Sequence, residues 1–348
     1  MNKKVRVLVV EDSNVVRQLL EHIIGRDPRL EMAGAVASAE EALRVLHRLS
    51  PDVISMDIRL PGMNGLEATT RIMSEKPTPI VVIASVESDE LKITLKALQA
   101  GALSVLEKPV GPGSDKYEAV AERICTQLFI MSQVRLVTRR GSVIQTPPRV
   151  QPQLSGRVGP FQMMGIVSST GGPSALAQLL GRGLSSDFPL PILLVQHIHS
   201  NFLSGFASWL QSVCPFSVKI VSNRETPVPG NVYLACEDRH LQLNSGWLEA
   251  TAGNPVCMQR PSGTVLFDSM AVALGSKTLG VLLTGMGEDG AEGLLRLRES
   301  GGHTIAEDES TAVVYGMPGE AFRLGAVCES LPLPAIGPRI LSLIDENL

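Results

Sequence analysis

Three polar residues in the C-terminal half have the side-chain types needed for catalysis by an activated hydroxyl group. Ser169, His197 and Asp289 each follow an apolar run of the kind that forms a buried strand. An imidazole can take the proton of a hydroxyl group, and a carboxylate can orient the imidazole and stabilise its charged form. Because the carboxyl ends of parallel strands share one edge of a sheet, residues far apart in sequence can meet there.

The serine lies in the stretch 163–172, MMGIVSSTGG, where an apolar run gives way to hydroxyl residues and two glycines. This pattern predicts a strand that turns sharply into a helix. The first N–H groups of such a helix lie beside the hydroxyl group, which suits a nucleophile next to an oxyanion site and equally a phosphate cradle. By residue type alone, Ser168 and Ser169 are both candidates for the nucleophile.

Each member of the trio also has a structural interpretation. A histidine at a strand end is more often structural, and His199 lies only two residues after His197. His240 could replace either if the region around it folds over the sheet edge. The segment 285–290 could be a tight loop whose aspartate only caps a helix. The glycines around Met286 equally allow backbone N–H groups to approach a developing oxyanion.

A second group of charged residues follows the predicted strands of the N-terminal half: Glu11, Asp12, Asp57 and Lys108. Three carboxylates at neighbouring strand ends repel one another unless a divalent cation lies among them, and Mg²⁺ prefers a few carboxylates together with water. We therefore predict Mg²⁺ bound by Asp12 and Asp57. One carboxylate can then act as nucleophile towards a phosphoryl group while the lysine neutralises the new charge. The alternative is that these residues only end strands at a solvated rim.

The elements that must position these groups alternate between strands and helices in both halves. Short connections between them predict an α/β fold in which parallel, doubly wound sheets are covered on both faces. The short apolar runs 218–221, 231–234, 241–243 and 247–248 predict an antiparallel excursion. The other predicted strands are 6–10, 52–56, 80–84, 103–106, 163–167, 191–195, 278–283, 303–307 and 326–327. One helix is predicted after Ser13, and the others cover 39–49, 65–74, 89–100, 115–137, 173–180, 202–210, 269–276 and 291–300. The sequence GMPGEA is predicted to be a turn.

The composition limits the classes of function. The 348 residues fit two domains, and the Pro-, Gly- and Gln-rich segment 138–160 predicts a linker between domains 4–137 and 161–343. A net charge of −4 argues against a general nucleic-acid binder. Five scattered cysteines, without a C-x-x-C pair, favour a reducing compartment. Without a signal peptide pattern or an apolar stretch that could span a bilayer, we expect a cytoplasmic protein.

The N-terminal half resembles the response-regulator receiver family at VVEDS, DIRLPGMNG and the pair Lys108-Pro109. The resemblance covers 4–137 and implies a flavodoxin-like receiver. It also implies that Asp57 accepts the phosphoryl group, that Glu11 and Asp12 form the acid pocket, and that Lys108 contacts the phosphoryl group.

Two positions depart from the receiver pattern. Ala84 stands where the family usually has a serine or threonine that bonds the phosphoryl group, and Asn64, in PGMNG, replaces the usual acid of the family's MDG turn. Ser85 is adjacent, but in an extended strand it points to the opposite face. The resemblance therefore implies phosphorylation without the usual hydroxyl contact.

The C-terminal half, 161–343, resembles the catalytic domain of the chemotaxis protein-glutamate methylesterases at SSTGGP, VQHIHSNF, TGMGEDGAEG and YGMPGEA. The resemblance implies Ser169 as nucleophile, His197 as base and Asp289 as third member. It implies oxyanion donors at Met286 and at the turn of Thr170. The chain departs from the pattern at His199, where proline is usual, and at Glu288, where asparagine is common.

The resemblance implies hydrolysis of γ-methyl glutamate esters on methyl-accepting chemotaxis receptors, with deamidation of receptor glutamines as a second activity. It implies a histidine kinase as phosphodonor and no cofactor for the esterase. We expect a monomer whose receiver inhibits the hydrolase until Asp57 is phosphorylated. Three alternatives stay open: a nucleotide- or phosphate-binding module, a receiver-dominated phosphate sink or scaffold, and the same chemistry in an array that controls something other than flagellar swimming. The first lacks the G-x-G-x-x-G pattern of a dinucleotide site.

Overall fold

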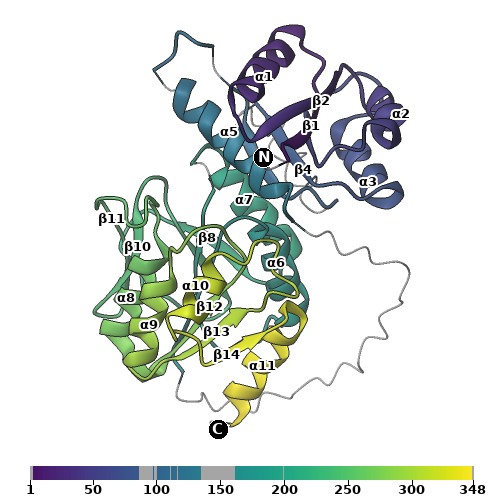
Figure 1. Cartoon of the computed structure of the whole chain (residues 1–348). Coiled ribbons are helices and arrows are strands. Elements are labelled where there is room, and N and C mark those ends of the chain that lie inside the picture. The colour runs from purple at the N-terminus through teal and green to yellow at the C-terminus, as the bar shows by residue number, and fades with distance from the viewer. Residues whose placement is uncertain are drawn as a thin grey trace. The chain divides into compact units, whose positions relative to one another are not determined.

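The computed structural model describes residues 3–85, 97, 100–109, 111–115, 117–134, 161–198 and 200–346. The chain divides into two compact units, Met1–Gly141 and Ser142–Leu348 (Figure 1). The predicted linker, His199 and most of the predicted helix 89–100 lie outside the described residues.

The described part of the first unit contains a five-stranded parallel sheet in the order β2-β1-β3-β4-β5. This order places the end of β1 beside the end of β3, so the acidic residues that follow them are neighbours. The edge strand β2 was not predicted, because its sequence LEMAGAV interrupts the apolar pattern with Glu, Gly and Ala. The strands are β1 (Val5–Val10), β2 (Leu30–Val36), β3 (Val53–Met56), β4 (Ile80–Ala84) and β5 (Ser104–Glu107).

Helices cover both faces of this sheet, with α1 and α5 on one face and α2 and α3 on the other (Figure 1). The side chains of Ser13, Ser38 and Asn64 accept N–H groups at the starts of the first three helices, which explains where these begin. Within the described residues, α5 is shorter than the predicted 115–137. The helices are α1 (Asn14–Arg26), α2 (Ala39–Leu49), α3 (Gly65–Glu75) and α5 (Tyr117–Met131).

The described part of the second unit contains a seven-stranded sheet in the order β14-β13-β12-β6-β7-β9-β8, in which all pairs are parallel. The central strand β6 has β12 on one side and β7 on the other. The strands are β6 (Met163–Ser168), β7 (Ile192–Gln196), β8 (Ser217–Val221), β9 (Asn231–Ala235), β12 (Thr278–Leu282), β13 (His303–Glu307) and β14 (Glu329–Leu331).

The predicted antiparallel excursion is wrong for its first half. Strands β8 and β9 pair in parallel and extend the main sheet, and only β10 (His240–Asn244) and β11 (Trp247–Thr251) form an antiparallel hairpin. Short apolar runs separated by Pro and Gly indicate strands, but they do not reveal whether the intervening chain turns back or crosses over.

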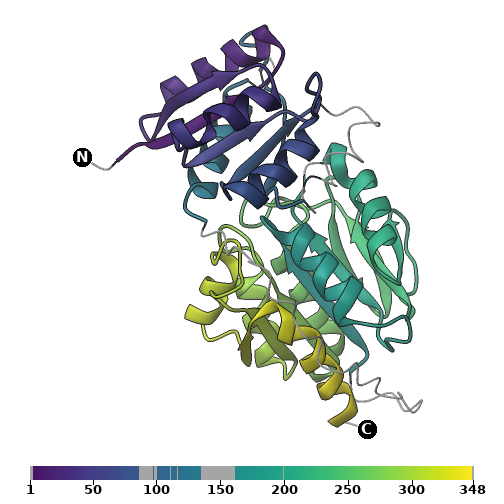
Figure 2. The ribbon, with the colours of Figure 1, turned by 90° about the vertical axis from the view of Figure 1, so that its right-hand side faces the viewer.

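Helices α8, α9 and α10 pack on one face of the sheet, and α6, α7 and α11 on the other (Figure 2). The predicted helix 269–276 begins earlier, at Gly263, because the first turns of α8 carry too few polar residues to show a helical period. The GMPGEA turn is the start of α10, the last strand lies at 329–331, and α11 was not predicted. The helices are α6 (Gly172–Gln178), which continues as a π-helical turn (Leu179–Gly183), α7 (Ser200–Val213), α8 (Gly263–Leu274), α9 (Ala291–Glu299), α10 (Met317–Arg323) and α11 (Leu333–Glu346).

Two general properties bear on the environment of the chain. All five cysteines are free thiols. Among the helices that the structure describes, none has both the length and the apolar character needed to cross a bilayer.

Candidate active site and phosphoacceptor site

The three candidate catalytic residues lie at the carboxyl edge of the second sheet. Ser169 follows β6, His197 follows β7, and Asp289 lies in the loop after β12. The N–H of Ser169 donates to the carbonyl oxygen of Thr284 at 3.0 Å, and the N–H of His197 donates to that of Ser168 at 3.0 Å. The strand order therefore brings all three to one place, because β7 and β12 flank β6.

A direct hydrogen bond joins the imidazole to the carboxylate. His197 Nε2 lies 2.8 Å from Asp289 Oδ2. An ionised carboxylate only accepts hydrogen bonds, so Nε2 is the donor in this pair, and in a neutral ring with this donor the lone pair is on Nδ1. This Nδ1 is buried and has no hydrogen-bond partner among the described residues. The ring is thus prepared to accept a proton at Nδ1.

The carboxylate of Asp289 is held at the N-terminus of α8. Ser262 Oγ donates to Oδ1 at 2.6 Å, and the N–H groups of Gly263 and Thr264 donate at 2.6 and 3.2 Å. Burial disfavours the ionised form, but the hydrogen bonds from His197, Ser262 and Gly263 outweigh it and lower the pKa of Asp289. The group is therefore charged at neutral pH.

The second candidate base, His240, is occupied elsewhere. Its Nδ1 accepts the N–H of Ser262 at 3.2 Å, so its Nε2 donates to the carbonyl oxygen of Asn254 at 3.0 Å. With both ring nitrogens engaged in a buried setting, this histidine supports the segment that holds Asp289. The geometry favours His197 as the base.

The two serines also differ. Ser168 is fully buried, and its hydroxyl group donates to Gln196 Oε1 at 2.7 Å. Ser169 is half-buried, and its Cβ lies 2.8 Å from where a Cβ on Gly285 would stand. This contact places Ser169 against the 284–287 loop, so the geometry favours Ser169 as the nucleophile.

The phosphate-cradle interpretation of this turn finds little support. The N–H of Gly172 already donates to the carbonyl oxygen of Ser169 at 2.9 Å, and the next residue, Pro173, has no N–H group. Two of the first donors of α6 are thus unavailable to a phosphate group.

Thr284 links the nucleophile turn to the rest of the sheet edge. Besides accepting the N–H of Ser169, it donates its hydroxyl group to the carbonyl oxygen of Thr170 at 2.9 Å. Its own N–H donates to Glu307 Oε2 at 2.8 Å. The exposed Met286 lies two residues further along this loop. Thr284 therefore fixes the turn and the predicted oxyanion loop relative to each other.

Sequence reasoning missed four residues that support the site: Gln196, Ser262, Thr284 and Glu307. Each is a buried polar residue. Gln196 and Glu307 end apolar strands, and this was the available signal. A buried polar side chain at the carboxyl edge of a parallel sheet faces the place where ligands bind.

Glu307 gives a prediction about stability. Burial raises its pKa to about 7, although the N–H of Thr284 favours the ionised form. The native state thus keeps a proton that the unfolded chain releases between pH 4.5 and 7, so stability falls as pH rises through that window. Above this window, ionised Glu307 lowers the free energy of unfolding by about 3 kcal/mol, and Glu307→Gln removes that destabilisation. We expect urea unfolding to show the variant gaining stability over wild type at pH 8 but little at pH 5. An equal difference at both pH values would contradict the assignment.

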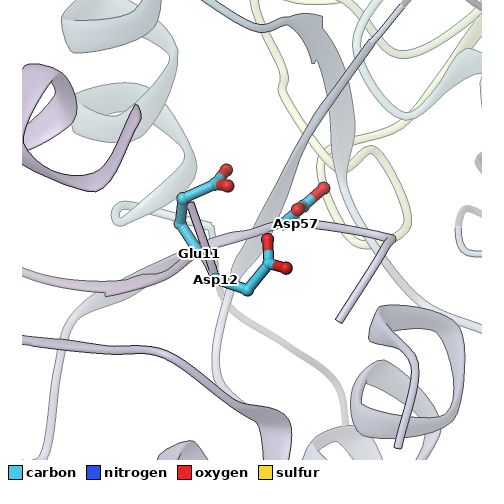
Figure 3. Close-up of side chains that lie close together, drawn as sticks. All are labelled: Glu11, Asp12 and Asp57. Carbon is cyan, nitrogen blue, oxygen red and sulfur yellow. The ribbon is translucent and has the colours of Figure 1, made fainter. Parts of the chain in front are cut away.

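The acidic residues of the first unit form a compact cluster. One carboxylate oxygen each of Glu11, Asp12 and Asp57 lies within 4.8 Å of the others (Figure 3). Glu11 and Asp57 are buried and Asp12 is exposed. Lys108 Nζ lies 2.9 Å from Asp57 Oδ2 and 3.0 Å from Glu11 Oε2. The structure therefore brings all four predicted residues together.

The electrostatics of this cluster fit a divalent cation. Burial, and then the charge of Asp57, raises the pKa of Glu11 to about 7. Burial also raises the pKa of Asp57, although Lys108 opposes the shift. A single lysine thus compensates the repulsion incompletely, and a second positive charge would stabilise the carboxylates. Oxygen ligands of this kind suit Mg²⁺.

The two departures from the receiver pattern have clear positions. Asn64 caps α3, with its side chain accepting the N–H of Glu67 at 2.9 Å. Ala84 ends β4, and its carbonyl oxygen accepts the N–H of Lys108 at 2.9 Å. No side-chain hydroxyl is therefore available from position 84 beside the lysine.

Phosphorylation of the cluster gives a second prediction. We expect the chain to become phosphorylated by acetyl phosphate with Mg²⁺, and Asp57→Asn to stay unmodified because the nucleophilic carboxylate is gone. Phosphate-affinity electrophoresis would show the difference, and EDTA should abolish the wild-type signal. Asp52→Asn is the matched control, since Asp52 accepts the N–H of Arg6 away from the cluster. A phosphorylated Asp57→Asn chain would rule out Asp57 as the acceptor.

Comparisons with known proteins give one result for both units. Residues 164–340 match the family CheB methylesterase, and residues 7–115 match the response regulator receiver domain. A protein-glutamate methylesterase/protein-glutamine glutaminase 2 of Paramagnetospirillum magneticum is 56% identical over 99% of this chain and 98% of its own length. A protein-glutamate methylesterase/protein-glutamine glutaminase 4 of Myxococcus xanthus is 42% identical over 98% and 97%. The crystal structure of the Thermotoga maritima CheB methylesterase catalytic domain superposes with a TM-score of 0.51 at 34% identity, covering 53% of this chain and 99% of that one.

Proposed function

The chain belongs to the protein-glutamate methylesterase/protein-glutamine glutaminase family with a receiver domain, and on this premise we propose that Ser169, His197 and Asp289 form its catalytic triad. Family membership makes it a hydrolase of carboxylic esters. The observation that carries the assignment of residues is the 2.8 Å bond between His197 Nε2 and Asp289 Oδ2, at the strand ends that flank Ser169.

The geometry supports acyl transfer through the serine. Ser169 Oγ attacks the γ-carbonyl carbon of a glutamate methyl ester while His197 Nδ1 takes the hydroxyl proton. Asp289 stabilises the resulting imidazolium. Backbone N–H groups at Met286 and at the turn of Thr170 hold the oxyanion. Methanol leaves with the proton from His197, and water then hydrolyses the acyl-enzyme by the same route.

The same groups deamidate glutamine. Ammonia takes the place of methanol as leaving group, and the acyl-enzyme is identical, so no further residue is required. Every step uses side chains and N–H groups of the chain itself. We therefore propose that the esterase reaction proceeds without a cofactor.

We propose that the receiver controls this reaction. Asp57 accepts a phosphoryl group from a histidine kinase. Asp12 and Asp57 would hold Mg²⁺, which would supply positive charge next to the phosphoryl group. Glu11 completes the acid pocket and Lys108 binds the transferred group. The substrates are glutamate methyl esters and glutamines of chemoreceptors, and the protein acts as a cytoplasmic monomer.

Methanol release from a methylated chemoreceptor tests the proposal. We expect the full chain to release methanol faster after treatment with acetyl phosphate and Mg²⁺ than before it. The Asp57→Asn chain should keep the basal rate under both conditions. Equal rates for wild type with and without acetyl phosphate would contradict the proposed regulation. No methanol release under either condition would contradict the proposed esterase activity.

A further inference from the structure

One buried amide contacts the main chain of both the nucleophile and the base. Gln196 is the last residue of β7 and is 5% exposed. Its Nε2 donates to the carbonyl oxygen of Ser169 at 2.8 Å and to that of His197 at 2.9 Å. Its Oε1 accepts the hydroxyl group of Ser168 at 2.7 Å. Both amide hydrogens are thus used on the two proposed catalytic residues.

These partners fix the orientation of the amide. The reverse orientation would place Oε1 against two carbonyl oxygens and turn the NH₂ group towards a hydroxyl group. The turn also packs closely over it, since a Cβ on Gly172 would lie 2.1 Å from Gln196 Oε1. The amide therefore has one position and little room to move.

The amide continues the pairing of β6 and β7 beyond their ends. The last backbone bond between these chains runs from the N–H of His197 to the carbonyl oxygen of Ser168. After it the two chains part, one towards α6 and the other away from the sheet. Beyond this point the side chain of Gln196 links the two chains, because it donates to the carbonyl oxygen of Ser169 in one chain and to that of His197 in the other.

We propose that Gln196 is a positioning residue that sets the separation of Ser169 and His197 for proton transfer. The proposal rests on the function proposed above, because it assumes that these two residues react with each other. Its hydrogen-bonding groups are all used on the chain itself, so it acts through the nucleophile and the base. Misplacement of reacting groups by about 1 Å lowers rates by about 10²-fold.

Substitution of Gln196 in the full phosphorylated chain tests this role. We expect Gln196→Met, which keeps the length but removes the donors, to lower kcat by about 10- to 100-fold. KM should change less than about threefold, because no substrate contact is lost. Gln196→Glu should lower kcat further, since it sets carboxylate oxygens against two carbonyl oxygens. Gln242→Met is the matched control, because this half-buried glutamine binds Thr251 in the β10–β11 hairpin.

A double-mutant cycle separates positioning from a general loss of structure. If Gln196 acts by placing the base, Gln196→Met should have almost no effect on the residual activity of His197→Ala. The same loss in both backgrounds, or an unchanged kcat in a folded Gln196→Met chain, would overturn the proposal. Full activity of Ser169→Ala would instead overturn the proposed function, so the two failures are distinguishable.

Discussion

Replacing Ser169 with alanine is expected to lower methanol release by at least about 10⁴-fold, because the attacking oxygen is removed and no acyl-enzyme can form. The side chain is half-buried against Gly285, and the backbone bonds of Ser169 do not depend on its hydroxyl group. The variant should therefore fold with a melting temperature close to that of wild type. Methanol release and thermal unfolding of the same preparation check both expectations.

The neighbouring hydroxyl group supplies the control for this experiment. Ser168→Ala removes the buried bond to Gln196 Oε1, so we expect a small loss of stability and a decrease in kcat of no more than about tenfold. If the Ser168 variant lost activity and the Ser169 variant kept it, the nucleophile would be misassigned. If both kept full activity, catalysis would not use this turn.

Asp289→Asn is expected to lower kcat by about 10³- to 10⁴-fold. All four partners of the carboxylate are donors: His197 Nε2, Ser262 Oγ and the N–H groups of Gly263 and Thr264. Asparagine offers one accepting oxygen and an NH₂ group. If the NH₂ group takes the Oδ2 position, it donates to His197 Nε2. The ring proton must then be on Nδ1, and the base has no lone pair there to accept the proton of Ser169.

The same substitution should also reduce stability. The N–H of Gly263 lies 2.6 Å from Oδ2 and would lose its acceptor, at about 1–3 kcal/mol for an unsatisfied buried donor. Asp268→Asn is the matched control, since Asp268 is an α8 carboxylate in an exposed pair with Arg296 and should change kcat little. Near-wild-type kcat for Asp289→Asn would show that the imidazole does not depend on this carboxylate.

The prediction of elements succeeded where the periodicity was regular. Strands β4 and β13 begin and end at the predicted residues, because each is a short run bounded by residues that break the pattern. Strand β2 and helix α11 were missed, and α8 was placed too late. In each of these the segment is stabilised by packing against neighbours that the local sequence does not show.

The direction of β8 and β9 was another error of the same origin. Their apolar runs predict strands, but parallel or antiparallel pairing depends on how the intervening residues 222–230 cross the sheet. The strand order depends on which strand pairs with β7. In the assembled sheet β9 takes that place, and β8 pairs with the other side of β9.

The sequence alone determined the residue types at the strand ends: a serine, a histidine and an aspartate in one half, and three acids with a lysine in the other. Alternating strands and helices require a parallel sheet, and a parallel sheet gathers its carboxyl ends at one edge. Candidates for both sites could therefore be named before any contact was known.

Only the tertiary structure decided which atoms of these residues face one another. It sets His197 Nε2 against Asp289 Oδ2, and it holds that carboxylate with an N–H group from the start of a helix. It favours Ser169 over Ser168 because the hydroxyl group of Ser168 is buried and donates to Gln196 Oε1. Hydrogen-bond direction and burial depend on neighbours from several elements, and a linear pattern of residue types does not encode them.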